Sequence, residues 1–428
     1  LVGFSLKFRD QETGLPGDLR DARAVAARLG IPFHVADLRE EFEREIVRPF
    51  VEAYRSGLTP SPCVRCNSLM KFDRLLLLAG KVGAGRIATG HYARLGRDSS
   101  SGRFVLSEAR DRNKDQSYFL FELTQDQLAR ALFPLGDLDK QEVRRIARAQ
   151  EIPVAEKPES QEICFVPDGD YASFVEAHGA PGGAGGGPGT PGDGPVVDVD
   201  GRVLGRHRGL HRYTVGQRRG LGIAHREPLY VLELRTGDNT VVVGERALLG
   251  SRRCRVVRPN WIAIPSLDGP LAVRARIRSR HEAAPAVISP LEDGGVEVVF
   301  DSPQPAVTPG QACVFYRDGA VVGGGGSERA RPVPARRSRQ ARRRRGDEGG
   351  GGEIRKGARR GGRSLGRPVR GGTGAAPRRA SRERKPPVLR GRRGRHAGGR
   401  CGVAVPRARA GAHRPQGSAH GVAHLLQN

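Results

Sequence analysis

Segments typical of strands alternate with segments typical of helices along the first 168 residues. Residues 1–6 are apolar and strand-like, and residues 18–29 repeat apolar side chains at helical spacing up to Gly30. Residues 31–35 and 86–89 are again typical of strands. The alternation predicts an α/β domain with a doubly wound parallel sheet. Ligands of such sheets bind at the carboxyl ends of the strands.

The pattern changes after about residue 167. A Gly/Pro-rich loop spans residues 179–194, and short β-type runs separated by Gly, Pro and Asp turns follow it. Runs at this spacing predict a small antiparallel barrel near the end of the globular part. We therefore expect four regions: an α/β domain (1–168), a small middle domain (169–250), a β-barrel (251–326) and a tail (327–428).

The charge is concentrated in the tail. The whole chain has a formal net charge of +27, but residues 327–428 hold 29 Lys and Arg against 5 Asp and Glu. The preceding residues hold 44 against 41, so the globular part is nearly neutral. The tail has no aromatic residue and is expected to be disordered. It is either a non-specific phosphate binder or a frame-shifted read-through, and the abrupt change in composition favours the second.

The start of the chain has no basic leader or cleavage site of a signal peptide, which predicts a cytoplasmic protein with no membrane partner. In a cytoplasmic protein, Cys63 and Cys66 favour metal or redox chemistry over a structural disulfide. They lie on a segment that two prolines are expected to hold as a rigid loop. Cys254 and Cys313 are expected to be buried hydrophobes. For Cys164, core packing and reactivity remain equal alternatives.

Six sequence blocks stand in an order and spacing that resembles the tRNA 2-thiouridylase family. The blocks are residues 59–67 (TPSPCVRCN), 88–94 (ATGHYAR), 113–120 (NKDQSYFL), 161–165 (QEICF), 214–222 (TVGQRRGLG) and 308–311 (TPGQ). The resemblance runs from Leu1 to about Gly325. It implies an α/β domain of the PP-loop ATP pyrophosphatase type.

The resemblance also implies the reaction. In this family ATP, with Mg²⁺, adenylates the C2 oxygen of the wobble uridine, and a persulfide then delivers sulfur to give 2-thiouridine. The matching positions make Cys164 the persulfide carrier and Cys66 the nucleophile that completes the transfer, leaving a disulfide between them. Such chemistry needs two thiols that can approach each other, at least one as thiolate. A cysteine-desulfurase-derived protein is the implied sulfur donor.

The remaining family positions are binding residues. Leu6 and Gly90 match contacts to the adenine nucleotide, and Ser61, Pro62 and Cys63 match the segment that holds the target base. Positions that match tRNA contacts, including the anticodon stem-loop, are His91, Lys114, Asp115, Gln116, Arg280, His281 and Gln311. Without the resemblance, His91 would be interpreted as a core histidine, and the alternating arginines at 274–280 as a solvated strand face.

Two features depart from the family pattern. The phosphate loop, Ser-Gly-Gly-Val-Asp-Ser, and the strand before it are expected upstream of Leu1, where backbone N–H groups would surround the pyrophosphate. A catalytically impaired tRNA-binding remnant is therefore the rival to an active enzyme. Some members have Asp in place of Cys63, so Cys63, Cys66 and Cys164 could alternatively hold an iron-sulfur cluster.

Overall fold

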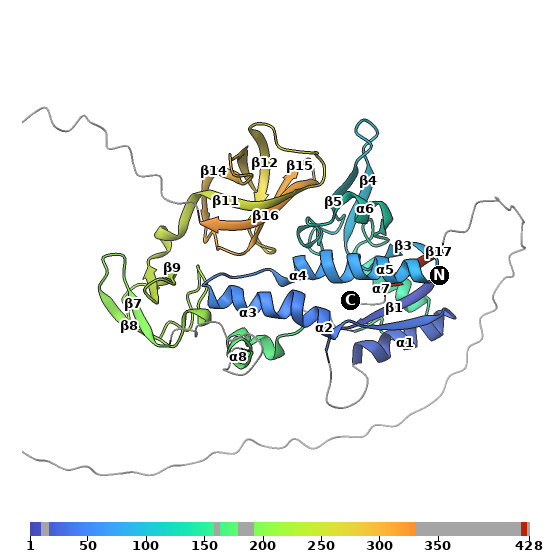
Figure 1. The fold of residues 1–428 in the computed structure, drawn as a ribbon, viewed down its shortest axis with the longest axis horizontal. Coiled ribbons are helices and arrows are strands. Elements are labelled where there is room, and N and C mark those ends of the chain that lie inside the picture. The colour runs from blue at the N-terminus through green and yellow to red at the C-terminus, as the bar shows by residue number, and fades with distance from the viewer. Residues whose placement is uncertain (10–16, 158–162, 179–191, 330–420, 426–428) are drawn as a thin grey trace, which may run out of the picture. The chain divides into compact units, whose positions relative to one another are not determined.

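The computed structural model describes residues 1–9, 17–157, 163–178, 192–329 and 421–425 (Figure 1). Predictions that concern the rest, namely most of the 179–194 loop and the greater part of the tail, lie outside the described residues. In the part that is described, no helix is long and apolar enough to cross a membrane.

A five-stranded sheet forms the centre of the first domain. Its order is β2-β1-β17-β3-β6, and all of its pairings are parallel, which confirms the predicted sheet. The edge strand β2 begins two residues later than expected. The strands are β1 (Val2–Lys7), β2 (Phe33–Asp37), β3 (Ala84–Ala88), β6 (Ala131–Leu132) and β17 (Gly421–Leu425).

The central strand of this sheet comes from the far end of the chain. Strand β17 pairs with β1 on one side and with β3 on the other. The expectation of disorder throughout residues 327–428 is thus wrong for these five residues, because both neighbouring strands offer backbone groups for them to pair with. It is also wrong for residues 327–329, which continue the last barrel strand.

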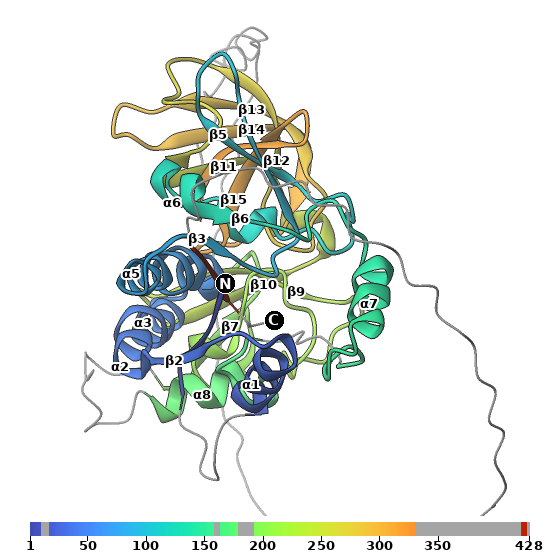
Figure 2. The ribbon, with the colours of Figure 1, turned by 90° about the vertical axis from the view of Figure 1, so that its right-hand side faces the viewer.

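Two long helical rods lie side by side next to the sheet (Figures 1 and 2). Each contains a π-helical stretch, in which hydrogen bonds span five residues instead of four. The first rod consists of α2 (Arg39–Phe42), η1 (Glu43–Val47) and α3 (Arg48–Arg55), and the second of α4 (Pro62–Arg65), η2 (Cys66–Arg74) and α5 (Leu75–Lys81). The remaining α-helices are α1 (Gly17–Leu29), α6 (Gln125–Arg130), α7 (Lys140–Ala149) and α8 (Tyr171–Ala177).

The helix α1 follows its predicted pattern except at its last residue. Leu19, Ala22 and Ala26 are buried, whereas Leu29 is 46% exposed. The helix ends at Leu29, and Gly30, with φ of +63°, turns the chain away from the core.

A small four-stranded sheet and a barrel follow in the chain. The middle sheet has the order β8-β7-β10-β9, and the barrel has the order β11-β14-β13-β12-β15-β16, closed by pairing of β11 with β16. Cys254 and Cys313 are fully buried in the barrel core, as predicted. The strands are β7 (Gly194–Val197), β8 (Val203–His207), β9 (Tyr230–Arg235), β10 (Thr240–Gly244), β11 (Gly250–Trp261), β12 (Leu271–Arg276), β13 (Ala284–Pro290), β14 (Val296–Pro305), β15 (Ala312–Arg317) and β16 (Ala320–Arg329).

The barrel is continuous with the first domain. A hairpin of that domain, β4 (Ala93–Arg97) and β5 (Phe104–Glu108), extends the barrel sheet through pairing of Ser107 with Ala320. Apolar residues of the barrel, such as Val314 and Val321, belong to the same buried cluster as the core of the α/β domain. Burial of this shared apolar surface favours a fixed arrangement of the two domains.

The glycine run in β16 permits close approach of the strands on both sides of it. A Cβ on Gly325 would lie 2.5 Å from the Val257 carbonyl oxygen and 2.7 Å from Val256 Cγ1. A Cβ on Gly326 would meet nothing nearer than Val257 Cγ2 at 3.8 Å. The two neighbouring glycines therefore differ sharply in the space around them.

We predict that Gly325→Ala lowers the free energy of unfolding by about 1–3 kcal/mol, since the methyl group forces β16 away from β11. Gly326→Ala is the matched control and should change it by less than about 0.5 kcal/mol. Urea unfolding followed by circular dichroism measures both. Equal effects of the two substitutions would contradict this explanation of the glycine run.

Candidate active site

Cys63 and Cys66 lie at the start of the second helical rod, and the prediction that they occupy a loop is wrong. Pro62 is at the first position of α4, where its fixed φ favours a helix and its missing N–H is not needed. Cys66 and Met70, one helical turn apart, are buried on the same side of the helix, and Val64 is buried as well. The helix thus starts at Pro62, with Cys66 facing inward and Cys63 exposed.

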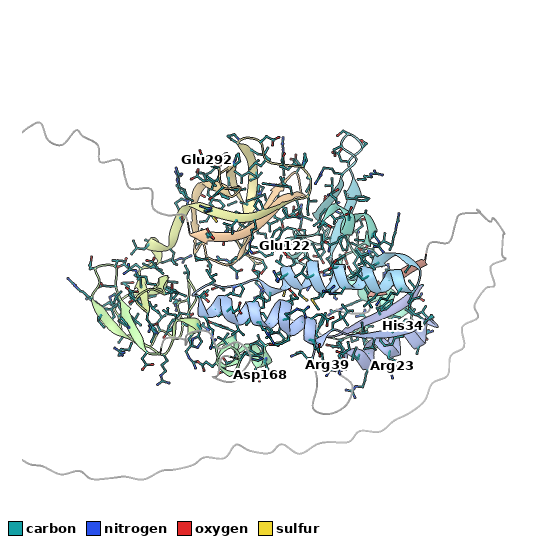
Figure 3. The ribbon with its side chains drawn as sticks, in the orientation of Figure 1. Arg23, His34, Arg39, Glu122, Asp168 and Glu292 are labelled. Carbon is teal, nitrogen blue, oxygen red and sulfur yellow. The ribbon has the colours of Figure 1, made fainter. Side chains whose placement is uncertain are left out.

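The rod is fixed to its surroundings by polar contacts on either side of the thiols. Arg65 donates to the Glu45 carbonyl oxygen at 2.8 Å and forms an ion pair with the Glu45 carboxylate, which connects the two rods. Ser68 donates to Glu122 Oε2 at 2.9 Å, and Figure 3 labels Glu122 beside the rod. These contacts hold the first turns of the helix in place.

Cys164 lies on a short segment anchored by the residue that follows it. Phe165 is buried and makes edge-on ring contacts with Phe42 and Phe50, with centroid distances of 5.5 and 5.1 Å. Cys164 itself is exposed and is a free thiol. The anchor places this thiol beside the helical rods while leaving it accessible.

The structure brings the three predicted thiols together. Burial raises the pKa of Cys66 to about 12, while the positive charge of Lys71 opposes the rise and the neighbouring Cys164 and Cys63 add to it. Desolvation raises the pKa of Cys63 and Cys164 too, and Lys71 again opposes it. Of the three, only Cys66 is buried, while Cys63 and Cys164 reach the surface. A cation beside clustered thiols favours their anionic forms.

Lys71 was not anticipated from the sequence. It follows Cys66 by five residues, and the π-helical stretch η2 begins at Cys66. In an ordinary α-helix, residue 70 would lie one turn after Cys66. The wider π turn places residue 71 there instead, which is why Lys71 is the neighbour of Cys66.

His91 is buried, and both of its ring nitrogens have protein partners. Nδ1 lies 2.8 Å from Thr89 Oγ1 and Nε2 lies 3.2 Å from Asn67 Oδ1. Since Asn67 Nδ2 donates to the Phe119 carbonyl oxygen, its Oδ1 accepts, and the ring is neutral with its proton on Nε2. Burial, followed by the Lys71 charge, lowers the pKa of His91 well below its usual value. His91 thus orients the residue next to Cys66, and its contact with tRNA stays a prediction.

The predicted nucleotide residues lie toward the carboxyl ends of parallel strands. Leu6 is buried in β1 one residue before its end, and Gly90 follows β3 by two residues. Parallel strands end at the same edge of the sheet, so these positions fit a nucleotide that contacts backbone groups there. The phosphate loop expected before Leu1 stays a prediction.

The predicted tRNA loop at residues 114–116 is connected to the barrel. The Asp115 side chain is only 2% exposed, and it accepts from Ser117 Oγ at 2.9 Å and from Arg276 at 3.1 Å. Gln116 Oε1 accepts from the Tyr92 backbone N–H, and Lys114 is partly exposed. Arg276 is therefore an interdomain ion-pair partner and not part of a solvated strand face. The buried position of Asp115 favours a structural role, with Lys114 more accessible to RNA.

The other predicted tRNA residues lie on two barrel turns. Arg280 is exposed and His281 half-buried in the turn after β12, and burial, with Arg278 and Arg276, lowers the pKa of His281. Gln311 lies in the turn before β15 and contacts the segment that precedes Cys63. Ser61 also contacts Gln311, and Pro62 is buried.

Within the described ranges, no three His, Cys, Asp or Glu side chains are arranged to hold a metal ion.

Comparison with known proteins agrees with the fold. Residues 5–168 match a tRNA methyl transferase HUP domain, residues 189–245 a tRNA methyl transferase PRC-barrel domain and residues 251–326 an aminomethyltransferase beta-barrel domain. The chain is 50% identical over 313 residues to the tRNA-specific 2-thiouridylase MnmA of Solibacter usitatus, covering 72% of this chain and 83% of that protein. The chain belongs to the tRNA-specific 2-thiouridylase family.

A second member of the family covers still more of the chain. The tRNA-specific 2-thiouridylase MnmA of Koribacter versatilis is 51% identical over 340 residues, which cover 76% of this chain and 91% of that protein. The protein from Syntrophotalea carbinolica is 50% identical over 310 residues, with coverage of 72% and 85%. The family assignment therefore extends across the three folded domains.

We predict that Lys71→Met slows alkylation of Cys66 by roughly threefold to tenfold below pH 10, because loss of the cation raises a thiol pKa that burial has already raised. In both proteins the rate should rise with pH, since only the thiolate reacts. Iodoacetamide labelling with peptide mass spectrometry resolves each cysteine. Arg65→Met, which removes a cation paired with Glu45, is the control. Equal slowing in both variants would refute a specific effect of Lys71.

Proposed function

We propose that this 2-thiouridylase transfers sulfur to the wobble uridine of tRNA, with Cys164 as the persulfide carrier and Cys66 as the thiol that completes the transfer. The observation that carries the proposal is the clustering of the two thiols beside a shared cation, Lys71. One thiol is exposed and the other buried. This difference suits a carrier that meets a donor protein and a second thiol that acts inside the site.

The transfer balances with these two cysteines. Cys164 accepts a sulfur atom from a donor protein, and the terminal sulfur of the resulting persulfide attacks C2 of the uridine. A C–S bond forms, the C2–O bond breaks, and the C2 oxygen leaves as part of AMP. The Cys66 thiolate then attacks Cys164 Sγ, so that the bond to the transferred sulfur breaks and a Cys66–Cys164 disulfide forms. An external thiol reductant supplies two electrons to restore both thiols.

The other residues of the site bind and orient. ATP is the second substrate and, when bound against the strand ends near Leu6 and Gly90, makes the C2 oxygen a leaving group. Lys71 stabilises the thiolate and persulfide anions. We assign the target base to Ser61, Pro62 and Cys63. The tRNA substrate and the sulfur donor are components of the cytoplasm, where we expect the enzyme to act.

The two thiols have separable roles that substitution can test. Cys164→Ser should lose persulfide loading from a cysteine desulfurase supplied with ³⁵S-cysteine, because it removes the accepting sulfur. In a single turnover without added reductant, Cys66→Ser should load normally but release at least about 100-fold less thiolated tRNA, since no thiolate is left to break the S–S bond. A mercury-containing gel that retards thiolated tRNA measures the product. Loading that survives in Cys164→Ser would overturn the assignment.

Cys63→Ala distinguishes the persulfide mechanism from the iron-sulfur alternative. The persulfide mechanism does not use this sulfur, so thiolation should persist within about threefold in anaerobically purified protein. Joint loss of iron, acid-labile sulfide and activity would replace the persulfide mechanism with a cluster-dependent one.

A further inference from the structure

The segment that leads into the thiol-bearing helix lies against both of the following domains. Residues 57–61 precede α4 directly, and the Thr59 backbone N–H donates to the Pro309 carbonyl oxygen of the barrel at 2.9 Å. Thr59 Oγ1 donates to Thr214 Oγ1 of the middle domain at 3.2 Å. The start of the helix is thus held from outside its own domain.

Gln311 makes most of the side-chain contacts to this segment. Its Nε2 donates to the Thr59 carbonyl oxygen at 2.9 Å and to the Pro60 carbonyl oxygen at 3.4 Å. Its Oε1 accepts from Ser61 Oγ at 3.2 Å. One side-chain amide therefore contacts three successive residues, the last of them next to Pro62.

The backbone around Gln311 is shaped for this approach. Gly310 has φ of +91°, and a Cβ there would lie 2.9 Å from the Thr59 backbone nitrogen. Only glycine meets both requirements. The Gln311 backbone carbonyl accepts from the Ser327 N–H at 2.7 Å, which fixes the turn to β16. Thr308 Oγ1 donates to the Val215 carbonyl oxygen at 3.3 Å and brings the middle domain to the same point.

We propose that Gln311 is a positioning residue that clamps residues 59–61 and thereby sets where Cys63 and Cys66 present their thiols to the target base. The identity of the target base rests on the proposed function. The hydrogen bonds between Gln311 and residues 59–61 do not depend on that proposal. Because the clamp belongs to the barrel, binding of RNA to the barrel would be coupled directly to the geometry of the catalytic helix. Misplacement of reacting groups by about 1 Å can cost a hundredfold in rate.

The clamp is tested with Gln311→Met, which keeps the size of the side chain and removes its hydrogen bonds. Amide hydrogen exchange in residues 59–65 should become about tenfold faster or more, because local opening is no longer opposed by these bonds. The kcat for tRNA thiolation should fall at least about fivefold, with KM unchanged within about twofold. Gln304→Met is the matched control, since among the described residues the Gln304 side chain bonds only to Ser302.

Two results would overturn the proposal. One is exchange in residues 59–65 that stays as in the unsubstituted protein, and the other is a rise in KM alone, which would make Gln311 a direct tRNA contact. Hydrogen exchange needs no catalytic activity. If the unsubstituted protein thiolates no tRNA, the proposed function fails while the exchange measurement still decides whether the clamp exists.

Discussion

Burial of the helix that begins at Pro62 is the constraint on which the site depends. Val64, Cys66 and Met70 enter the same apolar core as the sheet, so the helix cannot rotate without exposing them. Cys66 is therefore buried because of its place in this pattern, and its raised pKa follows from burial. A thiol with a raised pKa needs a nearby positive charge to react as a thiolate. Lys71, on the same helix, provides that charge.

Two groups of interdomain contacts stabilise the site from the barrel side. One is the ion pair of Arg276 with Asp115, which also involves Ser117 and, through it, Tyr316. The other is the set of hydrogen bonds between Gln311 and residues 59–61. The apolar core is shared as well, since barrel residues pack in the α/β cluster. In this arrangement the barrel helps to hold the reacting groups in place, in addition to any role in binding RNA.

Sequence patterns predicted the architecture because helical and strand periodicities are local. They placed the parallel sheet, the barrel and the burial of Cys254 and Cys313. They failed for features that depend on contacts formed only in the folded protein. The helix at Pro62 was expected as a loop, since prolines at positions 60 and 62 suggest one, although proline also favours a first helical turn. Lys71 was missed because a π-helical stretch has no periodicity that the sequence shows, and β17 because its pairing partners lie some 330 residues or more away.

If Cys164 carries the sulfur and Cys66 completes the transfer, a single turnover must form disulfide and thiolated uridine in a fixed ratio. We would load the protein with persulfide, add ATP and tRNA without reductant, and map disulfides by mass spectrometry under acidic quench. The account predicts one Cys66–Cys164 disulfide for each thiolated uridine, because each transfer oxidises this pair once. Thiolated tRNA formed while Cys66 and Cys164 both remain reduced, or formed together with a Cys63–Cys66 disulfide, would contradict it.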